Sequence, residues 1–145
     1  MSIDEVKSAI EAKLGAGAAA AADYAAKGYH LEVKMRSAQV IPLAQAMSEA
    51  GLYLEDVTCV DWLAERQMEV LYRYASYREP LRVMGRCRLE RDAEKVPSIA
   101  TVYQGANWHE REVFDMFGVH FSGHPDLKRI LLPEDATIHP LRKDF

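Results

Sequence analysis

Residues 54–89, LEDVTCVDWLAERQMEVLYRYASYREPLRVMGRCRL, contain the features that decide the fold. Three strand-like runs, at about 54–62, 68–77 and 81–89, follow one another with short links between them. The third run alternates with the period of two that is typical of a half-buried strand. Its apolar face has Leu81, Val83, Cys87 and Leu89, and its other face has Arg82, Met84, Arg86 and Arg88. Because the links are short, these runs predict an antiparallel meander.

The residues before the meander predict two helices and one further strand. Apolar residues recur at spacings of three and four over residues 2–14, which indicates an amphipathic helix that ends at Gly15. Alternating apolar and charged residues predict a strand over 31–35, and a second helix is expected from Ser37 to Ala50. The alanine-rich residues 18–26 are compatible with either a short helix or an edge strand.

The residues after the meander predict one helix and then an irregular segment. Asn107 is expected to cap this helix, with Glu110 completing a capping box, and the helix is expected to reach Phe117. Residues 118–145 show neither the helical nor the strand period. They still contain large apolar side chains, so we expect them to lie against their own domain or another protein chain. The apolar residues of this stretch include Leu127, Ile130, Leu131 and Leu132.

Strands that are grouped together between flanking helices are typical of an α+β fold. We therefore expect a two-layer domain with a mostly antiparallel sheet packed on helices, followed by an irregular C-terminal arm. The expected division places the globular domain at 1–104, and the last helix and arm at 105–145.

The composition excludes several classes of protein. The chain has 145 residues and a formal net charge of −4, whereas nucleic-acid-binding domains usually carry a basic surplus. No apolar run reaches the roughly 20 residues of a bilayer span, and no signal peptide is expected at the N-terminus. Cys59 and Cys87 form no CxxC pair, which suits a reducing compartment and excludes a self-contained iron–sulfur site.

Three carboxylates within two turns, Glu110, Glu112 and Asp115, allow a catalytic interpretation as general acid and base. We favour the alternative, in which they cap the helix or lie in solvent or at an interface, and Arg111 pairs with Asp115 one turn away. A metalloenzyme is also disfavoured. His109 and Glu110 resemble the start of a zinc-protease helix, but the second histidine of that motif is absent, because position 113 is valine.

Two further sites remain as weaker possibilities. His120 and His124 are four residues apart, but Gly123 and Pro125 interrupt any helix between them, so packing or hydrogen bonding is favoured over a metal site. The arginine face of the third strand run allows an independent binding module. Because the chain is acidic overall, we favour a solvated face or an acidic protein partner over nucleic acid.

The last third of the chain resembles a known family signature. Residues 110–118 read EREVFDMFG and residues 124–131 read HPDLKRIL, which is similar to the signature of the thirty-kilodalton (C) subunit family of respiratory complex I, NADH:quinone oxidoreductase. The flanking stretches VTCVDW at 57–62, LLPED at 131–135 and HPLRKD at 139–144 are similar too. The resemblance covers about residues 54–145.

The resemblance implies a non-redox structural subunit with a mixed sheet, in the peripheral arm of a proton-translocating NADH or related-donor:quinone oxidoreductase. It implies no active site and no cofactor or metal in this chain; flavin, iron–sulfur clusters and quinone would belong to other subunits. The implied partners are the hydrogenase-large-subunit-like (D) protein that helps form the quinone site and other peripheral-arm subunits, on the cytoplasmic face of the inner membrane. The signature or partner-interface residues that it implies are Glu110, Arg111, Glu112, Asp115, Phe117, His124, Pro125, Asp126, Lys128, Arg129, His139, Arg142 and Lys143.

Alternatives to this function remain open from the sequence. One is a subunit of a related membrane-bound energy-converting hydrogenase, and another is a stand-alone binding module or enzyme. Membrane association is expected only through the complex, and nucleic acid is not an expected partner. The apolar residues of the arm also allow a homodimer of the isolated chain.

Overall fold

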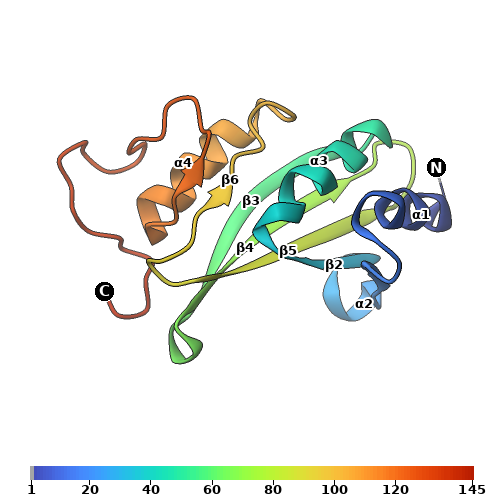
Figure 1. The fold of residues 1–145 in the computed structure, drawn as a ribbon, viewed down its shortest axis with the longest axis horizontal. Coiled ribbons are helices and arrows are strands. Elements are labelled where there is room, and N and C mark those ends of the chain that lie inside the picture. The colour runs from blue at the N-terminus through green and yellow to red at the C-terminus, as the bar shows by residue number, and fades with distance from the viewer. Residues whose placement is uncertain (1) are drawn as a thin grey trace.

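The structure, a computed structural model, describes residues 2–145. Figure 1 shows helices packed along an elongated sheet, with the C-terminal segment gathered at one end. The helices are α1 (Ile3–Leu14), α2 (Tyr24–Lys27), α3 (Val40–Glu49) and α4 (Ala106–Phe117), with short 3-10 turns at Ser37–Gln39 and Leu63–Glu65. The strands are β1 (Ala19–Ala21), β2 (Leu31–Met35), β3 (Tyr53–Trp62), β4 (Gln67–Ala75), β5 (Arg82–Glu90), β6 (Val96–Pro97) and β7 (Phe121–Ser122).

The main sheet has five strands in the order β1-β2-β5-β4-β3. Strands β3, β4 and β5 form the antiparallel meander, and β2 adds to β5 in parallel, which makes the sheet mixed. Strand β1 pairs antiparallel with β2 at one edge. The expected α+β class with a mixed, mostly antiparallel sheet is therefore confirmed.

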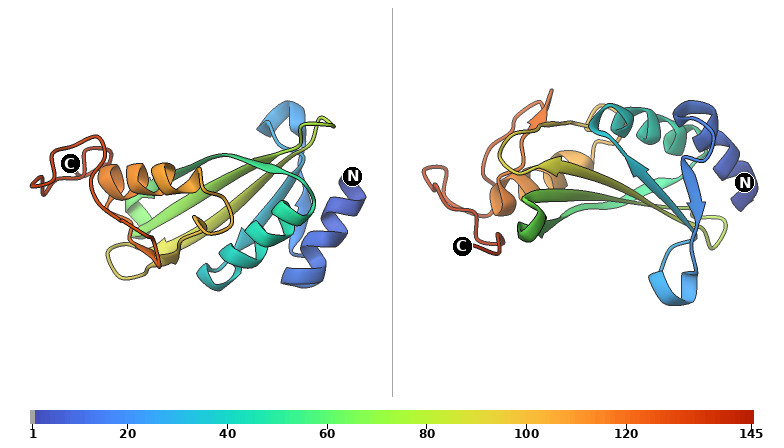
Figure 2. Two further views of the ribbon diagram at one scale, coloured as in Figure 1. Left: turned by 90° about the horizontal axis from the view of Figure 1, so that it is seen from above. Right: turned by 60° about the horizontal axis from the view of Figure 1, so that its bottom comes forward.

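One face of the sheet carries the hydrophobic core. Val6 and Ile10 of α1 and Leu43 and Met47 of α3 are fully buried against it, as is Tyr72 of β4. Helix α4 contributes Ala106 and Val113 to the same core cluster, so its first turns belong to this layer. The views in Figure 2 place α1 and α3 on one side of the sheet and the short α2 on the other.

Gly85 of β5 is required by close packing on this face. A Cβ atom there would lie 2.8 Å from Cδ2 of Leu43 and 3.0 Å from Cε of Met35. The absence of a side chain thus lets α3 approach the centre of the sheet.

The opposite face of the sheet is covered by charge pairs. Arg73, Arg82 and Arg86 lie 3.3–3.5 Å from carboxylates of Asp56, Glu55 and Glu32, respectively. Their aliphatic stems lie on a face that also holds a small apolar cluster of Tyr29, Leu71 and Met84. Because carboxylates neutralise the arginines, this face has little surplus positive charge for a nucleic acid.

The structure assigns the regions that the sequence left open. Residues 18–26 form both alternatives in succession, edge strand β1 and then helix α2, which Asp23 caps through the N–H of Ala25. The helix expected from Ser37 begins instead at Val40, after a 3-10 turn. Within residues 2–145, no helix has both the length and the apolar character needed to cross a membrane.

Candidate functional site

Helix α4 carries the first half of the signature, and the Glu110 carboxyl on this helix is fully buried. Oε1 of Glu110 accepts a hydrogen bond of 2.6 Å from the Ser98 hydroxyl, and Oε2 accepts one of 2.9 Å from the N–H of Ile99. Burial raises the pKa of Glu110 above its ordinary value of 4.5, and these two hydrogen bonds offset that rise only in part. Glu110 therefore ties α4 to the segment that precedes it.

The expected capping box at this helix is wrong. The helix begins at Ala106 after Gly105, and no side chain caps it. Asn107 lies inside the helix, and Glu110 turns inward because Ser98 and Ile99 offer it donors in the core.

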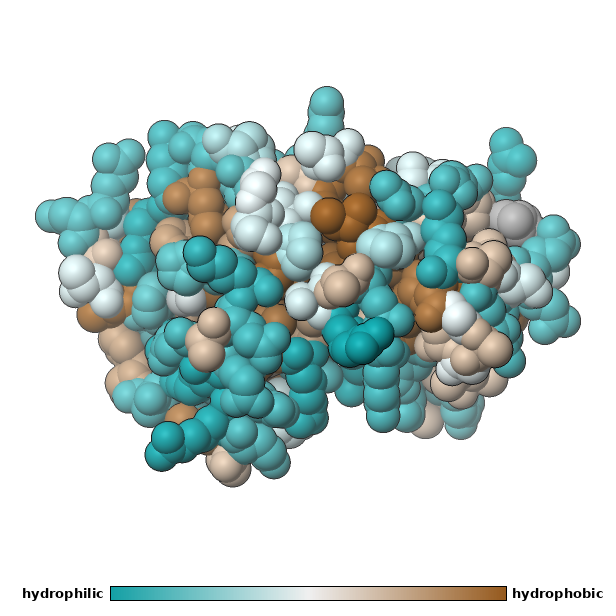
Figure 3. Space-filling view, viewed as in Figure 1, coloured by the Kyte–Doolittle hydropathy of each residue, from teal (hydrophilic) through white to brown (hydrophobic). Residues whose placement is uncertain are grey.

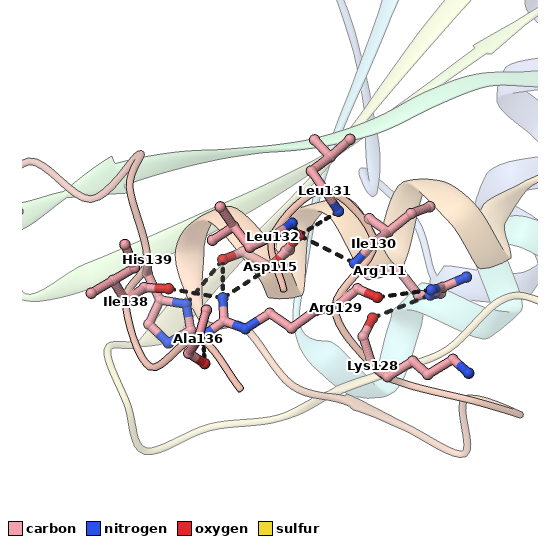
Figure 4. A network of polar contacts seen from close by, with 10 residues as sticks. All are labelled: Arg111, Asp115, Lys128, Arg129, Ile130, Leu131, Leu132, Ala136, Ile138 and His139. Carbon is pink, nitrogen blue, oxygen red and sulfur yellow. Dashed lines mark hydrogen bonds and ion pairs between the residues drawn. The ribbon is translucent and has the colours of Figure 1, made fainter. Parts of the chain in front are cut away.

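Asp115, one turn further along, is also fully buried and organises the arm, which we define as residues 118–145. Its Oδ2 accepts hydrogen bonds of 3.2, 2.7 and 2.9 Å from the N–H groups of Ile130, Leu131 and Leu132. Its Oδ1 lies 2.9 Å from Nη1 of Arg129. Figure 4 shows the arm curling around this carboxylate.

The ionisation of Asp115 is favoured by these contacts. Burial alone would raise the pKa of Asp115, but the N–H groups of residues 130–132 and the Arg129 guanidinium outweigh it, so the pKa lies below its ordinary value of 3.8. The hydrogen bonds and the ion pair of Asp115 therefore compensate for the cost of burying its charge.

Two arginine side chains bind backbone carbonyls of the arm and of α4 instead of facing solvent. Arg129 donates to the carbonyls of Asp115, Ala136 and Ile138 at 2.7–2.8 Å. Arg111 donates to the carbonyls of Lys128 and Arg129 at 3.1 and 2.9 Å. The expected Arg111–Asp115 pair is thus wrong, because Arg129 takes the carboxylate and Arg111 satisfies the loop backbone (Figure 4).

The arm returns to the end of α4 through His139 and Arg142. Nδ1 of His139 lies 3.1 Å from the carbonyl oxygen of Asp115, and Nε of Arg142 donates to the carbonyl of Phe117 at 2.7 Å. Arg142 also pairs with Asp92, and this hydrogen bond holds the pKa of Asp92 below its ordinary value. The free carbonyls at the C-terminus of α4 are satisfied in this way.

The last residues of the arm are attached to the edge of the sheet. Asp61 at the end of β3 is 2% exposed, pairs with Arg91 and accepts a hydrogen bond of 2.8 Å from the N–H of Lys143. Arg91 also pairs with Asp144 at 2.6 Å. The ammonium of Lys143 lies 5.9 Å from the ring centre of Trp62. These contacts hold the C-terminal residues against the end of β3.

His124 has a structural role. Its Nε2 lies 3.1 Å from the carbonyl oxygen of Asn107, which can only accept, so Nε2 carries the proton. Its Nδ1 accepts a hydrogen bond from the N–H of Asp126. Both ring nitrogens are therefore occupied, and the side chain is fully buried 3.9 Å from Glu110. Among residues 2–145, no three His, Cys, Asp or Glu side chains are grouped closely enough to hold a metal ion.

The structure thus divides the thirteen signature residues into two groups. One group turns inward and holds the arm against α4: Glu110, Arg111, Asp115, Phe117, His124, Arg129, His139 and Arg142. The other group is exposed: Glu112, Pro125, Asp126, Lys128 and Lys143. The sequence did not separate these groups, since both mix charged and apolar residues.

Several apolar side chains near the signature are exposed. Trp108 in α4 is 67% exposed, and the arm exposes Leu131, Ile138, Leu141 and Phe145 by 47–72%. Figure 3 shows that the face seen in Figure 1 has small hydrophobic patches separated by hydrophilic side chains. Large apolar groups that a polar scaffold holds outward are typical of a surface that another protein covers.

Gly118 ends α4 at φ +79°, and a Cβ atom there would lie 2.7 Å from Nη2 of Arg142 and 2.9 Å from Nε2 of His139. We expect Gly118→Ala to lower the free energy of unfolding by about 2 kcal/mol, since both the backbone conformation and the two contacts oppose a side chain. The matched control is Gly123→Ala, at φ +75° with no atom within 4 Å, which should cost about half as much. Urea denaturation of the three proteins measures this difference, and equal losses would show that the close approach is unimportant.

Sequence reasoning missed Ser98, Arg91 and Asp92 as partners of the signature. Ser98 follows β6, a two-residue strand that pairs in parallel with β7 and shows no detectable period. Arg91 and Asp92 follow β5 as two neighbouring residues of opposite charge. The sequence offers no other indication of their contacts with the arm. Asp61 lies in a flank that resembled the family, but its contact with Lys143 joins residues 82 positions apart.

Comparisons with known proteins agree with this geometry. The family model described as respiratory-chain NADH dehydrogenase, 30 Kd subunit, matches residues 33–145. The C subunit of NADH-quinone oxidoreductase from Moorella thermoacetica is 44% identical over 93 residues, covering 64% of this chain and 63% of that protein. The C subunit of F(420)H(2) dehydrogenase from Methanosarcina mazei is 40% identical over 94 residues, covering 64% of this chain and 60% of that protein.

A solved structure extends the likeness over nearly the whole chain. A chain in the structure of the membrane-bound sulfane sulfur reductase, an archaeal respiratory membrane complex, superposes with a TM-score of 0.82 at 26% identity. The alignment covers 98% of this chain and 84% of that one. This chain spans just over 60% of the length of the Moorella relative, so the likeness to that protein is to part of it. Because the family model covers most of the residues, including α4 and the whole arm, the chain belongs to the family of the 30 kDa subunit of respiratory-chain NADH dehydrogenase.

Proposed function

We propose that this chain is a non-catalytic structural subunit of the peripheral arm of a complex I-like NADH or related-donor:quinone oxidoreductase. In this proposal its α4 and arm, residues 105–145, pack on the hydrogenase-large-subunit-like protein that helps form the quinone site, while residues 1–104 provide the globular support. The observation that carries the proposal is that α4 and the arm hold five large apolar side chains outward on a scaffold of buried polar contacts.

The internal contacts explain how an irregular segment can serve as an interface. Residues 123–145 contain no helix or strand, so their backbone lacks regular hydrogen bonds. The Asp115 carboxylate and the Arg111 and Arg129 guanidinium groups supply hydrogen bonds in their place, and Arg142 ties the end of the arm to the Phe117 carbonyl of α4. A loop that is ordered before binding loses less conformational entropy on association, which favours assembly.

The chemistry of this chain is consistent with a role without electron transfer. Burial raises the pKa of Cys59 and Cys87 to about 12, so both thiols are protonated near neutral pH, and neither belongs to a cluster of metal-ligating side chains among residues 2–145. In the proposal, flavin, iron–sulfur clusters and quinone are held by other subunits, and the chain reaches the cytoplasmic face of the membrane through its partners. Without these partners the isolated chain would expose the same apolar surface. Two copies of the chain could then cover this surface by forming a homodimer.

The test is co-purification of the tagged chain with a hydrogenase-large-subunit-like partner from a native membrane extract. We expect Leu131→Ser combined with Phe145→Ser to lower the recovered partner by at least about tenfold, because two exposed anchors are lost from the interface. The matched control is Tyr77→Ser, which removes an 82% exposed ring in the turn between β4 and β5 and should leave recovery unchanged. Figure 1 shows this turn at the other end of the sheet from α4 and the arm. Recovery that is equal for both variants would contradict an interface on the arm, and no partner with the wild-type chain would contradict the proposed function itself.

A further inference from the structure

In α4 and the arm, arginines point inward, whereas most of the exposed charged side chains are acidic. Three arginines point inward and donate to backbone carbonyls, namely Arg111, Arg129 and Arg142. The exposed charged side chains of residues 105–145 are five carboxylates and two lysines. The carboxylates are Glu112, Asp126, Glu134, Asp135 and Asp144, and the lysines are Lys128 and Lys143.

Three of these carboxylates have no partner within the described residues 2–145. Asp126 pairs with Lys128 at 3.3 Å, and Asp144 pairs with Arg91. The side chains of Glu112 on α4, and of Glu134 and Asp135 on the arm, make no hydrogen bond or ion pair with residues 2–145. The formal charge of residues 118–145 is zero because four acidic and four basic residues cancel, so the sequence alone does not show an acidic surface.

The exposed apolar side chains alternate with these carboxylates along the chain. Trp108 precedes Glu112 by one turn of α4, and Leu131 and Ile138 lie on either side of Glu134 and Asp135. We propose that the arm and α4 dock on a basic surface with apolar pockets on the neighbouring protein, so that Lys or Arg side chains of the partner pair with Glu112, Glu134 and Asp135. This inference rests on the proposed function, since it specifies the chemistry of the partner surface.

The proposal follows from electrostatic complementarity. Unpaired carboxylates at the edge of an apolar surface lose hydration when a partner covers them, and this loss is compensated only by cations or hydrogen-bond donors across the interface. An acidic or purely apolar partner surface would leave them uncompensated. The inward arginines do not supply this compensation, because their donors already bind backbone carbonyls and the Asp92 and Asp115 carboxylates.

The experiment uses the intact complex assembled with tagged wild-type or variant chains, and measures recovery of the hydrogenase-large-subunit-like partner over a salt series. Glu134→Lys combined with Asp135→Lys should lower recovery at low salt by about tenfold, and Glu134→Gln combined with Asp135→Asn should lower it by less. Asp4→Lys, an exposed reversal on α1 at the other end, is the control and should behave like the wild type.

A second measurement identifies the partner surface directly. A photo-crosslinking residue at position 135 or 138 of the intact complex should capture partner peptides that contain Lys or Arg next to apolar residues. If the wild type recovers the partner but the Lys variants bind as well as Asp4→Lys, or the captured peptides are acidic, the charge proposal is wrong while the proposed function stands. If the wild-type chain recovers no partner, the proposed function itself fails.

Discussion

Asp115→Ala is expected to lower the free energy of unfolding by about 3–5 kcal/mol, because it leaves the buried Arg129 guanidinium without its counter-ion. The same change removes the acceptor for the N–H groups of Ile130, Leu131 and Leu132. Urea denaturation of the purified chain measures the loss. Amide hydrogen exchange should show that residues 128–142 lose protection before the main sheet does, because Asp115 holds the arm and not the core.

The control for this prediction is Asp126→Ala. Asp126 is an exposed carboxylate that pairs only with Lys128, so its removal should cost within about 0.5 kcal/mol. If Asp115→Ala and Asp126→Ala cost the same, the Asp115 contacts do not hold the arm.

Asp115 also gives the stability a defined pH dependence. The pKa of Asp115 is lower in the folded chain than in the unfolded chain, where it is about 3.8. Its carboxylate therefore stabilises the fold fully above the unfolded-state pKa. This stabilisation is lost as the pH falls through the folded-state pKa. Asp115→Asn lacks this titration. Its stability should therefore fall less steeply than that of the wild type below about pH 4.

The sheet and the first helix were predictable because their contacts repeat locally. The alternation of apolar and polar residues over 81–89 depends only on which face of β5 is buried. The spacing of Val6 and Ile10 depends only on the period of the helix. The parallel pairing of β2 with β5 was not readable from periodicity, because a strand's pattern carries no information about its neighbour's direction.

The arm was not predictable in the same way. Arg129 binds backbone carbonyls at Asp115, Ala136 and Ile138, and a carbonyl has no signature in sequence because every residue has one. The spacing of Arg111 and Asp115 predicts an ion pair within the helix. In the structure Arg111 instead donates to the backbone of the arm, and Asp115 pairs with Arg129. The family resemblance pointed to thirteen signature residues, whereas only the geometry distinguishes those that hold the arm from those that face outward.

Glu110→Ala is the second change with a large expected effect, about 3–5 kcal/mol. It leaves the N–H of Ile99 and the hydroxyl of Ser98 without their acceptor and opens a cavity under α4. Glu112→Ala, two residues along the same helix but exposed and unpaired among residues 2–145, should change the free energy of unfolding by less than about 0.5 kcal/mol.

Glu110→Gln separates the hydrogen bonds from the charge. The amide oxygen of glutamine can still accept from Ile99, so this variant should stay within about 1 kcal/mol of the wild type near neutral pH. Because burial raises the pKa of Glu110, its contribution to stability is fully present below the unfolded value of about 4.5 and is lost as the pH rises through the folded value. The glutamine keeps its contribution at every pH, so the stability of Glu110→Gln relative to the wild type should increase from pH 4 to pH 8. A relative stability that instead decreases over this range would mean that the ionised carboxylate, and not the neutral group, is what this site favours.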